Sequence, residues 1–510
     1  MVNPSFSPLD ATDYRGDAWN VQRNLTAFSN QTFDLLIIGG GIFGAGTARD
    51  AAMRGLRVAL VEQGDFASGT SSRSSKLIHG GFRYLEQKAF GLVAEASRER
   101  RILQKIAPHR VKPLSFLLPV YKGDPRPLWE MRLGMTIYDV LALFRNAGNH
   151  HTLGPSQVHT VEPRLETRDL RGAIQFYDCQ EDDARFCIDN IMDADRMGAI
   201  CANYCHVTGF RTENDKIVAA NVTDRISGNR FEIRAKTFIN AAGPWVDRIG
   251  EMAPSPSTNS RPALSPTKGV HILLPAITLG HGIFFQGRSD GRMIFILPWH
   301  DCSLVGTTDT DFHGDPGKVA ADSSDVDYLL ARAAEIFPSA HFKASDVIAT
   351  IAGVRPLLKS NSADPSARSR EHQLLQTGDN FLSLCGGKYT TYRLVAKQAV
   401  DRTYDMLGSK APACRTGREH IPDFRPPTNG DPIAKSPSVL TSDVTHAVQQ
   451  EMAMSVEDVM WRRTSLMLSK SGGEATARSV TAIIRPLLGW SERQADDSVR
   501  NYLATRRAGI

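Results

Sequence analysis

The sequence predicts an α/β protein that begins with a βαβ unit, and three observations support this fold class. An apolar run, Leu35–Ile38, has the length and β-branched content of a buried parallel strand. A glycine-rich turn follows it, and an alanine-rich, proline-free helix is expected over Ala45–Arg54. A second apolar strand, Arg57–Val61, ends at Glu62, about twenty residues beyond the turn.

The turn Gly39-x-Gly41-x-x-Gly44 has residue types that suit a dinucleotide. Gly39 permits the tight turn, Gly41 lets a pyrophosphate approach the backbone, and Gly44 lets the helix lie close to the strand. The amides at the start of the helix favour the phosphate anions. Glu62 can accept hydrogen bonds from a ribose diol and disfavours a 2′-phosphate, so FAD or NAD is expected rather than NADP.

Size and charge narrow the class of protein. The chain has 510 residues, enough for two or three domains, and 60 basic against 55 acidic residues give a net charge of +5. This mild excess suits an anionic small substrate or an anionic membrane surface. No like-charge block or aromatic-basic pattern suggests nucleic acid. No apolar run is long enough to span a membrane and the N-terminus has no signal-peptide core, so a cytoplasmic protein is expected.

The cysteines argue against disulfides and against a metal site. Seven of them are scattered along the chain, which indicates a reducing compartment. Cys201-x-x-x-Cys205 lacks the usual zinc spacing and a matching second pair, so no metal is expected.

A hydroxyl-rich segment, Gly64–Glu86, follows the second strand at the ligand edge of the expected sheet. A flexible surface loop is one explanation. The position of this segment at the ligand edge favours contact with a cofactor instead, since hydroxyls and amides there can hold a pyrophosphate and a ribityl chain. The cofactor-binding candidates in this segment are Thr70, Ser71, Ser75, Lys76 and Gly81.

The middle of the chain alternates strands and helices. A helix is expected over Ala89–Ile106, with Arg98, Arg100 and Arg101 on its solvated face, and Pro125–Phe144 could form a helix pair. The further expected strands are Pro113–Tyr121, Gly172–Asp183, His206–Val222 and Arg230–Ile239. The last of these leads into the small-residue turn of Ala242 and Gly243, where a backbone can again approach a dinucleotide.

The second half supplies further candidates at strand ends. His271 lies on an expected strand, where a lone histidine is usually structural, and Arg355 ends another strand just before a proline. Gly387 and Lys388 precede a helix expected over Tyr389–Leu407, whose N-terminus can stabilise negative charge. A proline-rich linker, residues 422–437, then leads to a mainly helical C-terminal region.

Six motifs occur in order between about Phe33 and Leu407: IIGGGIFGAG, GTSSRSSKLIHGGFRYLE, NAAGPW, LVGTTDTD, AGVRPLL and LCGGKYTTYR. Together, and in this order, they resemble the FAD-dependent, quinone-linked glycerol-3-phosphate dehydrogenases. SREHQLL stands where the family has a TRDY-like stretch, and the C-terminal part looks shorter than the usual helical cap.

The resemblance implies an FAD-binding, Rossmann-like domain of the glutathione-reductase or D-amino-acid-oxidase type, a mixed-sheet substrate domain and a small α-helical cap. The expected domains are a lead-in at 1–32, a discontinuous FAD-binding domain at 33–90, 172–246 and 345–408, a substrate domain at 91–171 and 247–344, and a cap at 424–510.

The resemblance also implies roles for six residues in oxidising sn-glycerol 3-phosphate to dihydroxyacetone phosphate. Arg83 and Arg370, with Tyr84, would hold the phosphate by arginine forks. His271 would take the C2 hydroxyl proton as hydride leaves C2 for flavin N5. Two cations, Arg355 and Lys388, would stabilise the developing charge.

Partners and alternatives follow from the same resemblance. Electrons would pass to quinone at the cytoplasmic face of the inner membrane, with which the protein would associate peripherally, and a homodimer is compatible with the sequence. The alternatives are another polyol phosphate such as erythritol phosphate, an oxidase that uses O₂, an amine oxidase of related fold, and a flavin-bound binding or assembly protein without turnover.

Overall fold

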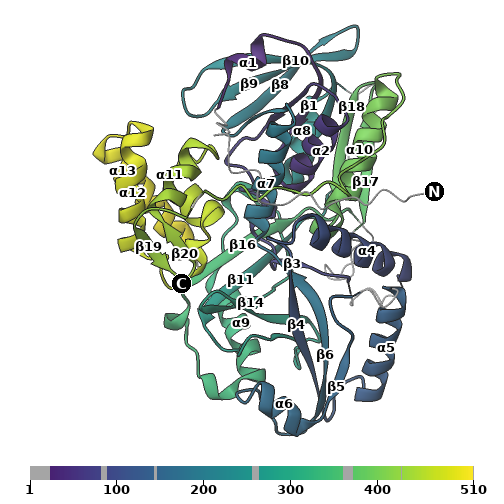
Figure 1. Ribbon diagram of the computed structural model, residues 1–510, viewed down its shortest axis with the longest axis vertical. Coiled ribbons are helices and arrows are strands. Elements are labelled where there is room, and N and C mark those ends of the chain that lie inside the picture. The colour runs from purple at the N-terminus through teal and green to yellow at the C-terminus, as the bar shows by residue number, and fades with distance from the viewer. Residues whose placement is uncertain are drawn as a thin grey trace, which may run out of the picture.

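The computed structural model describes residues 23–81, 89–142, 146–254, 264–359, 371–426, 428–508 and 510. Two large β-sheets lie end to end, and a helical C-terminal region lies beside the place where they meet (Figure 1). The sheets and the helices that cover them account for most of the described chain.

An eight-stranded sheet carries the βαβ unit. Its strands are β1 (Phe33–Ile38), β2 (Val58–Val61), β7 (Ile200–Ala202), β8 (Cys205–Glu213), β9 (Lys216–Asp224), β10 (Arg230–Asn240), β17 (His372–Thr377) and β18 (Phe381–Gly386). The central order is β17-β18-β10-β1-β2-β7, and the pairs from β18 to β7 are parallel. The carboxyl ends of β1, β2, β10 and β18 therefore meet at one edge, where the predicted turns follow.

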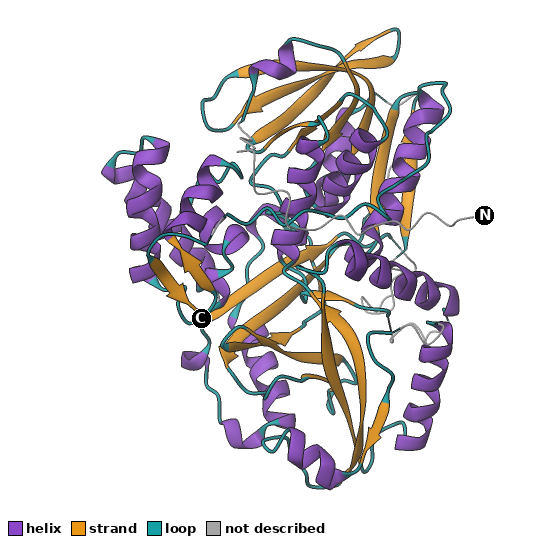
Figure 2. Ribbon diagram, viewed as in Figure 1, coloured by secondary structure: helices purple, strands orange, loops and turns teal. Residues whose placement is uncertain are grey.

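Helices cover one face of this sheet, as Figure 2 shows. The helices α2 (Ile42–Met53), α7 (Asp183–Arg196) and α10 (Tyr392–Met406) pack together and share a core with β1 and β2. The other face carries the β8–β9 hairpin and α8 (Val246–Met252), with a smaller core of its own. Because both faces are covered, β1 and β2 can be almost wholly apolar.

The second large sheet has ten strands and is mostly antiparallel. Its strands are β3 (Leu77–Ile78), β4 (Lys112–Tyr121), β5 (His151–Leu153), β6 (Leu170–Gln180), β11 (Thr267–Pro275), β12 (Gly282–Gln286), β13 (Met293–Trp299), β14 (Cys302–Gly306), β15 (Thr310–Asp311) and β16 (Ala349–Arg355). The order is β15-β11-β14-β13-β12-β4-β6-β3, with β16 paired to β11 and β5 paired to β6. Helices α4 (Phe90–Ile106), α5 (Leu128–Leu141), α6 (Pro155–Val161) and α9 (Ser323–Ile336) complete this part of the molecule. The short helix α1 (Thr26–Ser29) lies against β10 of the eight-stranded sheet instead (Figure 1).

The alternation of side chains along β11 places His271. Val270, Ile272 and Leu274 belong to the core that includes α9, whereas Leu273 belongs to the core shared with the C-terminal region. Successive strand residues point to opposite faces, so His271 lies on the same face as Leu273. The histidine therefore lies on the face of the sheet toward the C-terminal region.

The C-terminal region packs onto that face. It comprises β19 (Pro432–Lys435), β20 (Ser438–Leu440), α11 (Thr441–Gln449), a π-helical segment Asp458–Arg463, α12 (Glu474–Leu488) and α13 (Glu492–Arg506). Its apolar residues, including the buried Trp461, share one core with Leu273 and Leu297 of the sheet. Within the described ranges, no helix has both the length and the apolar character needed to cross a bilayer.

The structure differs from two expectations about helices. Residues 128–141 form the single helix α5 rather than a helix pair over Pro125–Phe144, of which residues 143–145 lie outside the described chain. Arg100 was expected on a solvated face but is buried, because its guanidinium pairs with Asp178 on β6. Arg98 and Arg101 are exposed, as expected.

The predicted domain boundaries stay a prediction, but the sheet pairing differs from them at three places. Strands β3, β16 and most of β6 fall in segments expected for the FAD-binding domain, yet all three pair within the ten-stranded sheet. Strand pairing is decided by long-range neighbours, which a single sequence does not display.

Candidate active site

The glycine-rich turn has the close approaches that a dinucleotide site needs. Gly39 has φ +113°, and a Cβ there would lie 2.5 Å from the carbonyl oxygen of Ala241. A Cβ on Gly44 would lie 1.8 Å from the carbonyl oxygen of Gly39, so helix α2 can pack against β1 only with glycine here. Gly41 is extended and caps α2, which leaves the first amides of the helix facing the edge of the sheet. These features fit the pyrophosphate of a dinucleotide.

Glu62 directly follows β2, as predicted. Its carboxylate accepts hydrogen bonds from the backbone amides of Gly40 and Gly64, at 2.7 and 2.9 Å. Burial raises the pKa of Glu62 above its ordinary value, and the two amides oppose that shift. The carboxylate is therefore held at the end of the turn, where a ribose diol would lie in a bound dinucleotide.

The hydroxyl-rich loop, residues 64–76, connects both sheets. The Oγ of Ser71 accepts a hydrogen bond from the amide of Ile42 at 2.9 Å, directly at the start of α2. Thr70 donates from its hydroxyl to the carbonyl of Val354 on β16 at 2.6 Å. The loop thus lies across the predicted phosphate site and reaches the end of the strand that carries Arg355.

Lys76 is a buried part of this loop. Its ammonium pairs with Asp183 at the start of α7 and donates to the carbonyl of Ser72 at 2.8 Å. Asp183 also accepts from the amide and hydroxyl of Ser74, at 3.0 and 2.7 Å. The lysine side chain thus fixes the loop to α7, while its contact with a cofactor stays a prediction.

His271 and Ser75 form a hydrogen-bonded pair. The Nε2 of His271 lies 2.9 Å from the Oγ of Ser75, and the ring packs over Gly306, where a Cβ would lie 2.1 Å from its Cδ2. The Nδ1 is buried and has no hydrogen-bond partner among the described residues. Burial, with the nearby charges of Arg355 and Lys76, lowers the pKa of His271 to about 3, so the ring is neutral at neutral pH.

Arg355 is held in a defined orientation. Its guanidinium donates to the carboxylate of Asp309 at 3.0 Å, to the hydroxyl of Thr307 at 2.8 Å and to the carbonyl of Thr308 at 3.2 Å. It lies across Gly269, where a Cβ would be 2.4 Å from Nη2. These contacts place a cation beside the strand that carries His271.

Two glycine turns meet near Lys388. Gly81 and Gly387 have φ values of +79° and +89°, in the left-handed region that favours glycine. The amide of His79 donates to the hydroxyl of Thr390 at 3.3 Å, which joins the end of the segment 77–81 to the turn before α10. Lys388 directly precedes the short helical turn that leads into α10.

Ala242 and Gly243 follow β10 beside the first glycine turn. The amide of Ala242 donates to the side chain of Asn240 at 3.3 Å, and Gly243 has φ +54°. A Cβ on Gly39 would also come within 3.0 Å of the Cα of Ala242. The structure therefore brings this turn next to the predicted dinucleotide turn.

The structure brings some of the predicted residues together and leaves others undescribed. The loop with Ser75 and Lys76 meets His271 and the strand of Arg355. The predicted phosphate-binding residues Arg83, Tyr84 and Arg370 all lie outside the described residues.

Two carboxylates that organise this site were not among the predicted site residues. Asp183 holds Lys76 and Ser74, and Asp309 holds Arg355. Asp183 stands in the acidic run QEDD and Asp309 in the LVGTTDTD motif, but neither run shows which cation each carboxylate will meet. That pairing depends on segments more than forty residues apart in the chain.

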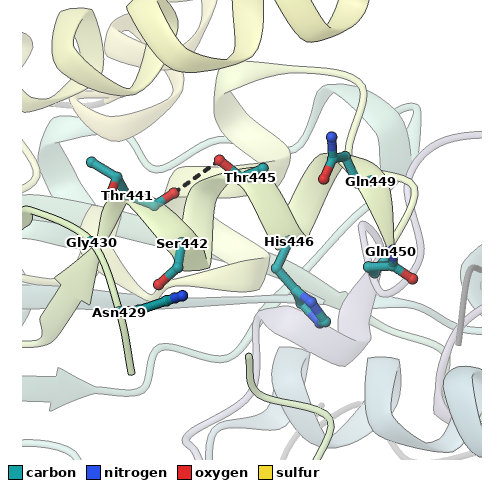
Figure 3. A pocket seen from close by; sticks show the side chains of 8 residues that line it. All are labelled: Asn429, Gly430, Thr441, Ser442, Thr445, His446, Gln449 and Gln450. Atoms are coloured by element: carbon teal, nitrogen blue, oxygen red, sulfur yellow. Dashed lines mark hydrogen bonds between the residues drawn. The ribbon is translucent and has the colours of Figure 1, made fainter. Parts of the chain in front are cut away.

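A separate cavity of 440 Å³ lies in the C-terminal region, around α11. Figure 3 shows its polar lining of hydroxyl, amide and imidazole side chains, with the hydroxyl of Thr445 donating to the carbonyl of Thr441 at 3.1 Å. The predicted cofactor and catalytic residues are not part of this lining.

Comparisons with known proteins identify the family of this chain. The family described as FAD dependent oxidoreductase matches residues 34–401, and the C-terminal domain of alpha-glycerophosphate oxidase matches residues 384–495. The chain is 34% identical to a glycerol-3-phosphate dehydrogenase of Synechocystis sp., over 94% of this chain and 97% of that protein. It is 39% identical to an aerobic glycerol-3-phosphate dehydrogenase of Staphylococcus haemolyticus, over 75% of this chain and 68% of that protein.

A solved structure shows the same architecture. The crystal structure of a glycerol-3-phosphate dehydrogenase from Bacillus halodurans complexed with FAD superposes with a TM-score of 0.76 at 27% identity, over 95% of this chain and 97% of that one. The match covers both sheets and extends through the C-terminal region. The predicted fold class and the FAD cofactor are confirmed, and the chain belongs to the family of FAD-dependent glycerol-3-phosphate dehydrogenases.

Proposed function

We propose that this protein oxidises sn-glycerol 3-phosphate to dihydroxyacetone phosphate with FAD and passes the electrons to quinone. The observation that carries the proposal is the group formed by neutral His271, oriented Arg355 and the hydroxyl-rich loop next to the dinucleotide turn. Oxidation of an alcohol needs a proton acceptor and a cation near the oxygen. The full-length similarity to glycerol-3-phosphate dehydrogenases supports the choice of substrate.

His271 is the proposed proton acceptor. Its ring is neutral at neutral pH, so a nitrogen lone pair can take the proton of the C2 hydroxyl. If Nε2–H donates to Ser75, the buried Nδ1 carries the lone pair and meets the substrate. A pKa near 3 makes the ring a weak base in the unliganded protein, and an incoming phosphate dianion would raise that pKa.

Arg355 and Lys388 are the proposed electrostatic partners. Arg355 would stabilise the negative charge that develops on the C2 oxygen, and Asp309 keeps its guanidinium oriented beforehand. Lys388, at the start of the turn into α10, would favour negative charge on the cofactor together with the helix N-terminus. FAD, when bound, supplies the acceptor for the hydride that leaves C2. Arg83, Tyr84 and Arg370 stay predicted to bind the phosphate.

Anaerobic reduction of the bound flavin tests this function. Purified holoprotein is mixed without oxygen with sn-glycerol 3-phosphate, erythritol phosphate or unphosphorylated glycerol, and the loss of visible flavin absorbance is followed. Rapid bleaching by sn-glycerol 3-phosphate alone is expected. A faster reaction with erythritol phosphate would reassign the substrate, and no bleaching by any alcohol would refute the proposal. Reoxidation by a soluble quinone, without release of hydrogen peroxide, would support the acceptor.

Peripheral contact with the cytoplasmic face of the inner membrane belongs to the same proposal, and helix α5 supports it. Four apolar side chains form a stripe on its outer face: Trp129, Leu133, Ile137 and Val140 are 68, 54, 38 and 50% exposed. Their spacing places them on one side of the helix. The helix lies at the outer edge of the molecule, beside β5 and β6 (Figure 1). An apolar stripe on a surface helix needs a partner.

Charge and area favour a lipid surface as that partner. The exposed Arg132 lies at one edge of the stripe, and Lys122 and Arg126 lie just before the helix on the exposed surface, although Arg126 pairs with Glu130 at 3.2 Å. Cations around an apolar stripe suit an anionic bilayer. The exposed apolar area of the four side chains is roughly 400 Å², about half of what each partner of a stable protein interface buries. A bilayer therefore fits this face better than a second copy of the chain.

A further inference from the structure

The C-terminal region contacts the hydroxyl-rich loop, which also contacts the dinucleotide turn. The segment that does so, Met460–Thr464, is here called the WRRT segment. It includes most of the π-helical turn and is buried. It contacts the loop at two points, through Asp65 and through Arg73. Neither point belongs to the catalytic group described above.

Asp65 is the first point of contact. Its buried carboxylate accepts from both terminal nitrogens of Arg463, at 2.7 and 2.9 Å, and from the Nε of Arg462 at 2.7 Å. Asn203 donates a further hydrogen bond at 2.9 Å. Although burial alone would raise the pKa of Asp65, the two guanidiniums hold it below its ordinary value. The carboxylate is thus ionised and almost fully satisfied by the WRRT segment.

Arg73 is the second point of contact. Its guanidinium lies over the ring of Trp461, 4.7 Å from the centroid, and donates to the carbonyls of Ser68 and Ala352 at 3.2 and 2.7 Å. Burial lowers the pKa of Arg73 to about 10, so the side chain remains charged at neutral pH. A cation that is desolvated over an indole is a favourable contact.

The same loop contacts the dinucleotide turn through other residues. The amide of Ala67 donates to the carbonyl of Gly40 at 3.0 Å, and Ser71 accepts from the amide of Ile42. Asp65 is two positions before Ala67, and Arg73 is two positions after Ser71. A displacement of the WRRT segment would therefore be transmitted to the phosphate-binding end of α2.

We propose that the WRRT segment clamps the hydroxyl-rich loop over the dinucleotide turn, so that FAD binding and docking of the C-terminal region stabilise each other. This inference rests on the FAD assignment made above. It gives the C-terminal region a role in retaining the cofactor rather than in contacting the substrate. Such coupling is reciprocal: each event favours the other by the same factor.

FAD affinity tests one direction of the coupling. Arg463→Met removes the fork to Asp65, and Asp65→Asn removes the carboxylate charge at nearly constant shape. Arg478→Met is the matched control, because Arg478 lies exposed on α12 and pairs with Glu474 and Asp496, far from the loop in sequence and contact. Apoprotein is titrated with FAD and quenching of flavin fluorescence is recorded. We expect the Kd to rise roughly 5- to 150-fold in both loop-contact variants and to stay unchanged in the control.

Hydrogen exchange tests the reverse direction and separates coupling from general destabilisation. Saturating FAD should slow amide exchange in the WRRT segment of the natural protein, and this slowing should disappear in Asp65→Asn. A merely structural role for Asp65 would speed exchange equally with and without FAD.

Three results would overturn the clamp. The first is an FAD Kd of Arg463→Met and Asp65→Asn that equals the Kd of Arg478→Met. The second is amide exchange in the WRRT segment of the natural protein that does not change when FAD is added. If Arg463→Met does not fold, Asp65→Asn decides the matter alone. The third is a natural protein that binds no FAD, which would refute the cofactor assignment together with the clamp. Unchanged Kd values in an active dehydrogenase would refute the clamp only.

Discussion

Replacing Arg355 by methionine should abolish most of the catalysis while leaving the cofactor in place. Arg355 ends β16, and its guanidinium is fixed by Asp309, Thr307 and Thr308. Because these partners orient the cation before substrate arrives, little reorganisation is needed when charge develops on the substrate oxygen. Methionine keeps much of the side-chain volume and removes the charge. The dinucleotide turn lies on other strands, so FAD content should not change.

The size of the effect follows from what a preorganised donor contributes. Loss of one such donor costs about 3 to 4 kcal/mol of transition-state stabilisation, or roughly 10²- to 10³-fold in kcat. Asp309→Asn is the informative companion, since it keeps the Arg355 cation and removes only its carboxylate partner at 3.0 Å. We expect Asp309→Asn to lose about tenfold, because the guanidinium is less well oriented but still present.

Stopped-flow reduction of the flavin without oxygen measures this step directly. The rate constant at saturating substrate separates chemistry from binding, and absorbance of the purified protein reports FAD occupancy. A reduction rate for Arg355→Met within threefold of the natural protein, at full FAD occupancy, would refute the assigned role. Loss of FAD from the variant would instead show that Arg355 supports the cofactor site.

Three further outcomes are expected. His271 has a folded-state pKa of about 3 against an ordinary value of 6.5, so the unfolded chain binds the proton first and stability is lost as pH falls from 6.5 towards 3. Between pH 7 and pH 5 this difference should lower the free energy of unfolding of the natural protein by about 2 kcal/mol, and His271→Asn should not show that decrease. Urea unfolding of both proteins at the two pH values measures it. Leu133→Glu should reduce co-sedimentation with anionic lipid vesicles at least about tenfold, whereas Leu487→Glu on α12, which is also exposed, should not; equal binding by both variants would exclude α5 as the contact. Gly44→Ala should destabilise the protein by about 3 kcal/mol or more in thermal unfolding, because its Cβ would lie 1.8 Å from the carbonyl oxygen of Gly39, and an unchanged melting temperature would contradict that packing.

The βαβ unit shows how far local pattern predicts structure. Apolar runs, glycine spacing and a terminal carboxylate all act within thirty neighbouring residues, so the sequence predicts β1, α2, β2 and the place of Glu62. Strand β4 and helix α4 were predicted for the same reason. Family motifs extended the prediction to the FAD cofactor, which the comparisons confirm. Which residues bind substrate stays a prediction.

Contacts between distant segments were decided only by the tertiary structure. The contact of Ser75 with His271, 196 positions along the chain, could not be read from the sequence, and the contact of Ser75 with the cofactor stays a prediction. Arg100 was expected in solvent but is buried against Asp178 on another strand. A single sequence shows which side chains can be charged or apolar. It does not show which of them share a low-dielectric interior, and there the position of each partner determines whether a charge is stable.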